Sequence, residues 1–227
     1  MTHWRLLAVA ALLAGCQSPA ITSTARTLPR GGADVALSLN LTRVSISSFE
    51  VDGVRVPSSG YTYPSFVPEL AIAFGVVDDL ELRGRLALAS GLIEAGLKYR
   101  VLHVDALHVA LAPALGYRTL GIVHGPVATL PLLLTYDLEP WLSLSGGPLV
   151  LAASYRVPDD FDGGDDADLA GDTLYAGAAL GFELRVGPLH LLPSVELQRS
   201  IARSGEASRL PAIDAVFISL SAGVGSR

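Results

Sequence analysis

The feature that most constrains this chain is a strict alternation of apolar and polar residues. It is clearest from Asp79 to Leu88, where leucine fills positions 80, 82, 86 and 88, and charged residues fill the odd positions from 79 to 85. A period of two places alternate side chains on opposite faces of a β-strand, whereas a helix repeats every 3.6 residues. The same period dominates from Ala33 onward. We therefore expect an all-β fold.

The alternation predicts about ten strands. They cover residues 33–45, 66–76, 79–88, 91–100, 106–118, 127–138, 140–155, 173–186, 189–199 and 212–224. Soluble sheets usually have strands of ~5–6 residues, whereas a strand that crosses a bilayer at a tilt needs ~9–11. The connections alternate between tight turns and long loops, with one short exception at Ala89 and Ser90. This layout predicts an antiparallel up-and-down transmembrane β-barrel.

Composition agrees with a membrane protein but excludes membrane-spanning helices. Half of the residues are hydrophobic and only 17% are charged. After the amino-terminal segment, the longest charge-free stretch, 119–136, contains two glycines and two prolines, and it falls short of the ~20 apolar residues that a spanning helix needs. With 16 basic and 22 acidic residues, the chain offers no basic face for nucleic acid.

The two faces of the predicted strands differ in side-chain size. A membrane barrel turns an apolar band outward and keeps its lumen polar, which inverts a soluble ligand-carrying barrel. The faces expected to point outward carry Leu70, Ile72, Phe74 and Val76, Leu107, Val109, Leu111 and Leu115, Leu130, Leu132 and Leu134, and Leu174, Leu180, Phe182 and Leu184. The opposite faces carry alanine, glycine, serine and charged residues, as from Gly177 to Arg185. Small and charged residues together predict a narrow, mostly filled lumen.

Charge pairing between strands 79–88 and 91–100 supports this assignment. If opposed residue numbers sum to 179, three opposite-charge pairs share one face: Asp79 with Arg100, Glu81 with Lys98, and Arg85 with Glu94. We predict these six residues as lumen charge pairs, because buried charges must be paired. A register with a sum of 177 still forms two pairs, and ion pairs across a solvated sheet are also favourable. The pairs alone therefore leave the soluble alternative open.

Aromatic residues and prolines bear on the barrel in opposite ways. Aromatics gather near both ends of the strands, which is typical of the two aromatic girdles of membrane barrels. Those expected at the short-turn end are Phe74, Tyr99, Tyr136, Trp141 and Phe182, and those at the long-loop end are Tyr61, Tyr63, Tyr117, Tyr155 and Tyr175. Against the barrel, Pro113, Pro131, Pro148 and Pro193 fall inside strands, where proline forfeits a ladder hydrogen bond unless a bulge or break absorbs it. The chain also lacks a C-terminal aromatic.

The amino terminus has a basic start, an apolar segment from Leu6 to Ala14, and the residues Leu13, Ala14, Gly15 and Cys16. The apolar segment is typical of a signal peptide, and its last four residues resemble the lipobox of bacterial lipoproteins. That resemblance implies cleavage before Cys16 and acylation of Cys16, the only cysteine. An ordinary signal peptide cut after Ala20 is the alternative. We predict a leader at 1–15, a flexible lipid-anchored tether at 16–32 and a barrel at 33–227.

No motif predicts catalysis, a metal ion or another cofactor. The acidic loop at 159–172 fails the calcium-loop spacing, because Gly164 stands where a third ligand should be. It is read as a solvated loop, with contact to divalent ions or lipopolysaccharide left open. His124 and three serines, Ser200, Ser204 and Ser208, fall in regions expected at the barrel rim, but no spacing ties them together. His108 and His190 are expected among lumen polar groups.

The residues from 33 to 224 resemble small outer-membrane β-barrel proteins in pattern. The resemblance implies an outer-membrane protein that contacts lipid, with acyl chains on Cys16 and with a structural or surface-interaction role. A lumen of about ten strands would be largely filled by side chains, and a narrow pore is the variant of this hypothesis. The main alternative is a soluble, lipid-tethered periplasmic β-barrel that binds an apolar ligand. A surface β-barrel hydrolase is the third hypothesis.

Overall fold

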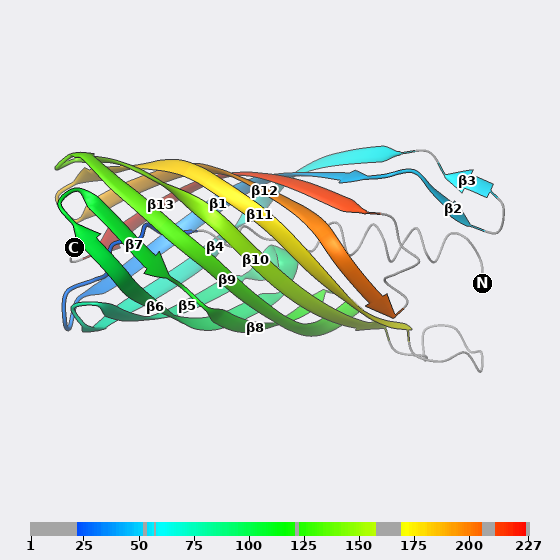
Figure 1. The fold of residues 1–227 in the computed structure, drawn as a ribbon, viewed down its shortest axis with the longest axis horizontal. Helices are drawn as coiled ribbons and strands as arrows, with labels where there is room; N and C mark the ends of the chain where they lie inside the picture. Colours follow the sequence, from blue (N-terminus) through cyan, green and yellow to red (C-terminus); the bar gives the residue numbers. More distant parts are fainter. Residues whose placement is uncertain are drawn as a thin grey trace.

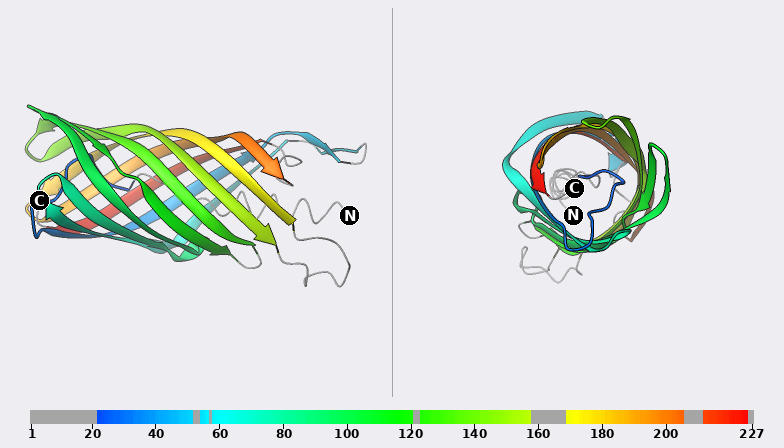
Figure 2. Two further views of the ribbon diagram at one scale, coloured as in Figure 1. Left: turned by 60° about the horizontal axis from the view of Figure 1, so that its bottom comes forward. Right: turned by 90° about the vertical axis from the view of Figure 1, so that its left-hand side faces the viewer.

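The strands close into a single antiparallel barrel in the computed structural model (Figures 1 and 2). The structure describes residues 22–51, 54–56, 58–120, 123–157, 169–205 and 212–225. The barrel strands are β1 (Ala33–Ile46), β4 (Ser59–Val77), β5 (Leu80–Ala87), β6 (Leu92–Val104), β7 (Leu107–Leu111), β8 (Ala114–Leu120), β9 (Val123–Glu139), β10 (Leu142–Val157), β11 (Leu169–Val186), β12 (Leu189–Gly205) and β13 (Ile213–Gly225). A short hairpin of β2 (Phe49–Val51) and β3 (Val54–Val56) lies between β1 and β4.

Closure comes from the pairing of the first barrel strand with the last. β1 is antiparallel to β13 along its whole length, from Asp34 opposite Gly225 to Ile46 opposite Ile213. If β7 and β8 are counted as one strand position and the β2–β3 hairpin is set aside, every other strand of the barrel pairs with the strands before and after it in the chain. Because β7 and β8 follow one another along the same stretch of wall between β6 and β9, the wall has ten strand positions. The predicted ten-stranded up-and-down barrel is confirmed.

The β7–β8 break shows how the wall accommodates a proline. The sequence predicts one strand over 106–118, but the structure interrupts it at Ala112 and Pro113. Pro113 has no N–H to donate, but its carbonyl accepts a hydrogen bond from Leu97 N at 3.0 Å. The proline therefore keeps a backbone hydrogen bond to the neighbouring strand β6. Two further prolines lie at interruptions of a ladder. The β9–β10 pairing skips from Gly146 to Leu149 around Pro148, and the β11–β12 pairing skips past Pro193.

Several strands run further toward the long loops than the hydrophobic pattern predicts. β4 begins at Ser59 rather than near 66, and β12 continues to Gly205 rather than ending near 199. The extensions are mostly polar, with the exposed Ile201 as an exception, so the regular alternation of apolar residues stops before the backbone pairing does. In the described part of the chain the one helical element is a 3₁₀ turn at Leu88–Ser90 (η1). No helix in that part is long and apolar enough to cross a membrane.

Candidate functional site: a charged lumen occupied by the N-terminal segment

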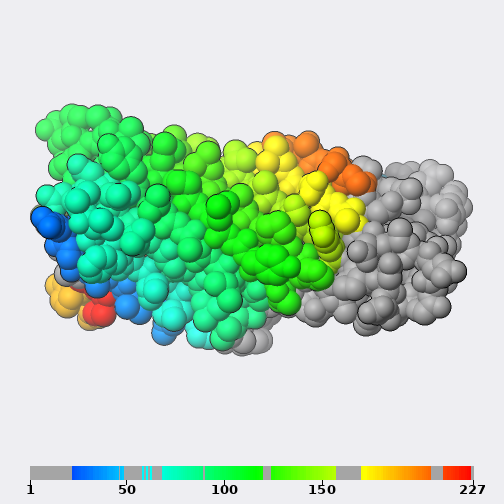
Figure 3. All heavy atoms as spheres, turned by 90° about the horizontal axis from the view of Figure 1, so that it is seen from below, coloured from blue at the N-terminus to red at the C-terminus, as the bar shows by residue number. Residues whose placement is uncertain are grey.

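The barrel wall is apolar outside and polar inside. On β1, the outward Leu37, Leu39 and Leu41 are 39–52% exposed, while the inward Ser38 and Asn40 are at most 5% exposed. The faces predicted to point outward on β4, β9 and β11 do so, with Ile72, Leu130 and Leu180 at least half exposed. Side chains of the middle strands cover the outer wall as one continuous surface (Figure 3). The inversion is that of a transmembrane β-barrel, and the fold and wall define this class.

Exposed aromatic residues lie at both edges of the apolar band. At the short-turn end Phe74, Tyr99, Tyr136, Trp141 and Phe182 are all 44–54% exposed and form one girdle. At the long-loop end the prediction of a second girdle is wrong for Tyr155 and Tyr175. These two are 5% and 4% exposed, because both fall on the inward face of their strands. Tyr117 is outward and 49% exposed, and the side chains of Tyr61 and Tyr63 lie outside the described set.

The structure brings together the three charge pairs of the β5–β6 hairpin, in the register whose residue numbers sum to 179. Glu81 Oε1 is 2.8 Å from Lys98 Nζ, and Arg85 Nη2 is 3.2 Å from Glu94 Oε2. Both pairs are buried in the lumen. Asp79 and Arg100 also pair, at 2.5 Å. Because the Asp79 side chain is 54% exposed in the turn before β5, this third pair lies at the rim rather than inside.

Residues 22–32, placed by sequence in a flexible tether, lie inside the barrel. Thr24, Ala25 and Leu28 are at most 2% exposed. The segment runs from the level of Arg83 to the short-turn end, where Gly31 N and Gly32 O bond to the backbone of Gly75 at 2.8 Å. The tether prediction therefore does not describe residues 22–32, while residues 16–21 and Cys16 itself lie outside the described residues. We call residues 22–32 the lumen segment.

Arg26 is the main electrostatic contact of the lumen segment. Its guanidinium pairs with Asp137 at the end of β9, and its Nη1 is 2.6 Å from Glu183 Oε2 on β11. The Arg26 and Glu183 side chains are 10% and 1% exposed. Arg185 Nε approaches the same Glu183 carboxylate at 3.7 Å, and His108 Nε2 lies 3.3 Å from Asp137. One arginine of the segment thus bridges two carboxylates that belong to different strands of the wall.

Backbone groups of the lumen segment also form hydrogen bonds with polar side chains of the wall. Leu28 N donates to Glu81 Oε2 at 3.1 Å, and the Thr24 carbonyl accepts from Lys98 Nζ at 3.2 Å. Ala25 N donates to Thr135 Oγ1 at 2.8 Å. The predicted Glu81–Lys98 pair therefore also holds two backbone positions of the segment. These contacts satisfy polar groups that would otherwise be buried without partners.

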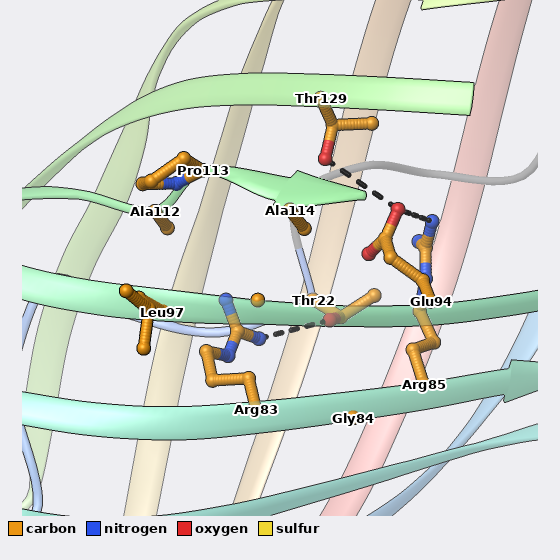
Figure 4. Close-up of a pocket in the computed structure, with 11 residues that line it drawn as sticks. Thr22, Arg83, Gly84, Arg85, Glu94, Leu97, Ala112, Pro113, Ala114 and Thr129 are labelled. Carbon is orange, nitrogen blue, oxygen red and sulfur yellow. Dashed lines mark hydrogen bonds and ion pairs between the residues drawn. The ribbon is translucent and has the colours of Figure 1, made fainter. Parts of the chain in front are cut away.

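A second cluster lies just above the segment, toward the long loops (Figure 4). Arg85 and Glu94 pair there, and Thr129 Oγ1 donates to Glu94 Oε2 at 3.4 Å. Arg83 reaches from β5 to Thr22 Oγ1 at 3.4 Å. Between them is a cavity of about 20 Å³, room for about one water molecule. At this height Thr22, Arg83, Arg85, Glu94 and Thr129 lie around the cavity.

The lumen also contains apolar side chains, most of them toward the long loops, that the sequence prediction of a small, charged lumen missed. They are fully or almost fully buried and comprise Val44, Leu92, Val127, Leu133, Leu149, Leu151 and Phe217. The signal was present where the alternation breaks, as at positions 130–134, where four leucines surround Pro131. A strand that is apolar on both faces packs one face against lipid or solvent and the other into the interior.

The residues weighed for catalysis are held by separate partners. His124 lies within β9 and its ring centroid is 6.3 Å from that of Tyr117. Ser200 faces the lumen and accepts from Ile213 N at 2.9 Å. Ser204 donates to Asp172 at 3.0 Å on the outer side of the barrel, where Ser154 does the same at 2.6 Å. Ser208 and most of the acidic loop, 158–168, lie outside the described residues.

His190 lies in the lumen, as predicted for it and for His108. Its Nδ1 is 3.6 Å from Asp34 Oδ1 at the short-turn end. Among the residues that the structure describes, no group of three or more histidine, cysteine, aspartate or glutamate side chains is placed to hold a metal ion.

Comparisons with known proteins give a likeness of fold. No protein-family model matches the chain, and no curated protein matches its sequence. Among solved structures, it is similar to the outer-membrane protease OmpT of Escherichia coli, with 10% identity and a TM-score of 0.48 over 90% of this chain and 99% of that one. An outer-membrane channel of Pseudomonas putida F1 gives 12% identity and a TM-score of 0.43 over 92% and 99%. Neisserial surface protein A gives 12% and 0.39 over 86% and 99%. At these values the likeness carries no argument about activity.

Proposed function

We propose that this chain is an outer-membrane β-barrel lipoprotein whose lumen is closed by its own N-terminal segment, and whose role is structural or in surface interaction. The observation that carries the proposal is the inverted wall. Large aliphatic and aromatic side chains on all sides of the barrel are roughly half exposed, while Glu81, Lys98 and Glu183 are at most 2% exposed inside it. A soluble barrel with this outer surface would present far more than the few hundred Å² of contiguous apolar area that monomers tolerate.

The height of the apolar band supports a membrane. On β12 the outward side chains from Leu189 to Leu197 are apolar, the next outward residue is the exposed Arg199, and a single exposed apolar residue, Ile201, follows it. Nine residues of tilted strand match the ~9–11 needed to cross the hydrocarbon core. On β1 the outward leucines likewise end at the exposed Arg43. A soluble, ligand-binding barrel would give no reason for the outward apolar residues of β1 and β12 to be followed by an arginine at the same end of the barrel.

A closed lumen argues for a role at the surface rather than in general diffusion. The lumen segment and the Arg26 contacts occupy the short-turn half, and the Arg85–Glu94 pair lies next to them toward the long loops. On the opposite side β1 and β4 continue to Ile46 and Ser59, and the β2–β3 hairpin lies beyond them (Figure 1). These extensions are the parts of the described chain best placed to meet a partner outside the membrane.

Lipidation of Cys16 is the second part of the proposal and rests on the lipobox. Five residues lie between Cys16 and Thr22, and the six Cα–Cα steps that join the two span at most ~20 Å. Because residues 22–32 already occupy the short-turn half of the lumen, we propose that a lipid on Cys16 reaches the bilayer from the long-loop side.

The experiment that tests the membrane location removes the lipid. The Cys16→Ser variant, expressed behind an ordinary cleavable signal, is fractionated and run on gels with and without boiling. The proposal expects the protein in the outer-membrane fraction with a mobility that shifts on heating, because the barrel alone holds it there. A soluble periplasmic protein without a heat-dependent shift would refute the membrane barrel and favour the apolar-ligand alternative.

A further inference from the structure

We propose that a groove in the outer wall binds one phospholipid with an ethanolamine headgroup, with an acyl chain along the groove, the ammonium group at Asp172 and the phosphate at Arg156. The inference rests on the proposed membrane location and adds to it a ligand of defined chemistry. Three properties of the described residues support it: the groove itself, its position at the edge of the apolar band, and two opposite charges at its polar end.

The groove crosses β8, β9, β10, β11 and β12, which lie side by side in the wall (Figure 1). Its volume is about 660 Å³, within the ~300–1,000 Å³ that is usual for small-molecule sites. The outward positions along its floor carry alanine, at Ala128, Ala152 and Ala202. Leu115 and Leu174 lie beside them. Because the wall is recessed at the alanines, an acyl chain can make close van der Waals contact there, which is what drives association within a bilayer.

The groove passes the long-loop edge of the apolar band. On β10 the outward residues from Leu142 to Ala152 have no polar side chain, and Ser154 and Arg156 follow them. On β11 the outward residues from Val186 to Leu174 are apolar, and Asp172 is the first charged one. One end of the groove therefore meets hydrocarbon and the other meets the headgroup region. A membrane lipid has the same order of apolar and polar parts, whereas a water-soluble ligand would find the apolar end covered by the bilayer.

Asp172 presents a fixed carboxylate at the polar end, beyond the apolar band. Ser154 Oγ donates to its Oδ1 at 2.6 Å, and Ser204 Oγ donates to its Oδ2 at 3.0 Å. The hydrogen bond from Ser154, and then that from Ser204, lower the pKa of Asp172, so the group is charged at neutral pH. A carboxylate has about four acceptor positions, and the serines use one on each oxygen. The others are available to an external N–H donor, because the Asp172 side chain is exposed.

The cation beside Asp172 is close but separate. Arg156 is exposed, and it follows Ser154 on the outward face of β10, diagonal to Asp172 across the β10–β11 ladder. Such diagonal neighbours are roughly 7–8 Å apart. Within the ranges that the structure describes, neither Asp172 nor Arg156 has an ion-pair partner. Arg203, the next cation along β12, pairs in the ladder with the buried Thr173 and so lies on the inward face.

These two charges match one kind of headgroup. Phosphatidylethanolamine carries a phosphate joined to a primary ammonium by a short ethylene chain, so one headgroup can meet both Arg156 and Asp172. Its ammonium donates charge-assisted hydrogen bonds to a carboxylate, which are stronger than neutral ones. Phosphatidylcholine has no N–H to donate. Phosphatidylglycerol has no cation, and its negative charge would face Asp172.

The first test compares headgroups on the wild-type protein. The full-length protein is purified in detergent, and native mass spectrometry counts the bound lipid as phosphatidylethanolamine, phosphatidylcholine or phosphatidylglycerol with the same acyl chains is added. We expect phosphatidylethanolamine to bind roughly tenfold more tightly than the other two, since only it donates charge-assisted hydrogen bonds to Asp172. Its mono- and dimethylated forms should lie between, in the order of the N–H groups that they keep. This series needs no variant to fold.

Two substitutions test the headgroup contacts. Asp172→Asn should lower the affinity for phosphatidylethanolamine to that for phosphatidylcholine, because asparagine keeps an acceptor for a serine but loses the charge. The matched control is Asp214→Asn, which removes an exposed carboxylate outside the groove that already pairs with Arg199, and it should leave both affinities unchanged. Arg156→Gln should weaken the binding of all three lipids, because all three carry the phosphate, and should preserve the preference for ethanolamine.

A further pair of substitutions on β10 tests the groove. Ala152→Trp fills the floor of the groove and should weaken the binding of all three lipids. Val150→Trp is the control, because Val150 is outward on the same strand but does not line the groove. A heat-dependent shift of gel mobility shows that each variant has folded.

The outcomes separate this inference from the proposed function. If the wild type prefers phosphatidylcholine or phosphatidylglycerol, or has no preference, the ethanolamine assignment is wrong and the membrane barrel stands. Equal binding by Ala152→Trp and Val150→Trp would place the lipid elsewhere on the wall and overturn the groove. If the Cys16→Ser protein is soluble in the periplasm and shows no heat-dependent shift, the membrane location fails and the lipid site fails with it.

Discussion

Lys98 and Glu81 face each other across β6 and β5, with Nζ and Oε1 2.8 Å apart and both side chains 2% exposed. The pair has two further partners in the lumen segment. Glu81 accepts from Leu28 N and Lys98 donates to the Thr24 carbonyl. One ion pair therefore joins a hairpin of the wall to the segment that fills the lumen. A buried charge that loses its partner is costly, whereas an exposed one is not.

We predict that Lys98→Met destabilises the barrel by about 3–5 kcal/mol, because it leaves the Glu81 carboxylate without its cation. The double variant Lys98→Met with Glu81→Gln should recover most of this loss, since glutamine keeps an oxygen for Leu28 N. Urea unfolding in phospholipid vesicles, followed by the fluorescence of Trp141, measures the change. Arg100→Met is the control, with an expected loss of at most ~1 kcal/mol because its partner Asp79 is exposed. Equal losses for Lys98→Met and Arg100→Met would contradict a desolvated lumen pair.

The outer wall gives a prediction that depends on depth in the bilayer. Val195 is outward on β12 inside the apolar band, six residues beyond Leu189, which is outward at its short-turn edge. Val195→Arg should destabilise the vesicle-bound protein by ~2–4 kcal/mol, against ~0–1 kcal/mol for Leu189→Arg. The same urea titration measures both. If the two substitutions are equally harmless, the wall faces water and the membrane assignment fails.

A comparison of Gly91 with Gly187 tests the contact between the tip of the β5–β6 hairpin and Thr119. Gly91 and Gly187 have φ of +60° and +59°, so alanine costs both roughly 1–2 kcal/mol of backbone strain. A Cβ on Gly187 meets open space, but one on Gly91 would lie 2.6 Å from the Thr119 carbonyl carbon. Thr119 N also donates to Gly91 O at 2.9 Å. We expect Gly91→Ala to lower the free energy of unfolding well beyond Gly187→Ala. Equal losses would mean that the tip does not pack on β8 in solution.

The route of the lumen segment predicts the side on which the amino terminus is found. An epitope inserted between Ser18 and Pro19 should be labelled by antibody on intact cells, since Thr22 lies inside the barrel and the short-turn half is already filled. The same epitope in the Gly187–Pro188 turn serves as control and should be labelled only after the cells are permeabilised. Labelling of both only after permeabilisation would place Cys16 on the periplasmic side.

Sequence alone predicted the parts of this protein that depend on neighbours along the chain. The alternation around Leu82 assigned the two faces of β5, and a tight hairpin allowed few registers, so Glu81 could be matched to Lys98 by number. Each such pairing is local, and a one-residue slip would turn every leucine inward. The outward faces of β4, β9 and β11 followed for the same reason. The prediction for Tyr155 and Tyr175 was wrong because it used their position along the strand and not the face of the strand on which they lie.

Only the tertiary structure decided what fills the lumen. Residues 22–32 carry no alternation, and as a polar stretch they are typical of a tether. Their partners lie far away in sequence: Ala25 bonds to a residue 110 positions on, and Arg26 to one 157 positions on. Those partners share one space only after β13 pairs with β1 and closes the cylinder. Local alternation therefore specifies the wall, whereas the contents of the lumen depend on closure, which brings Asp137 and Glu183 onto one arginine.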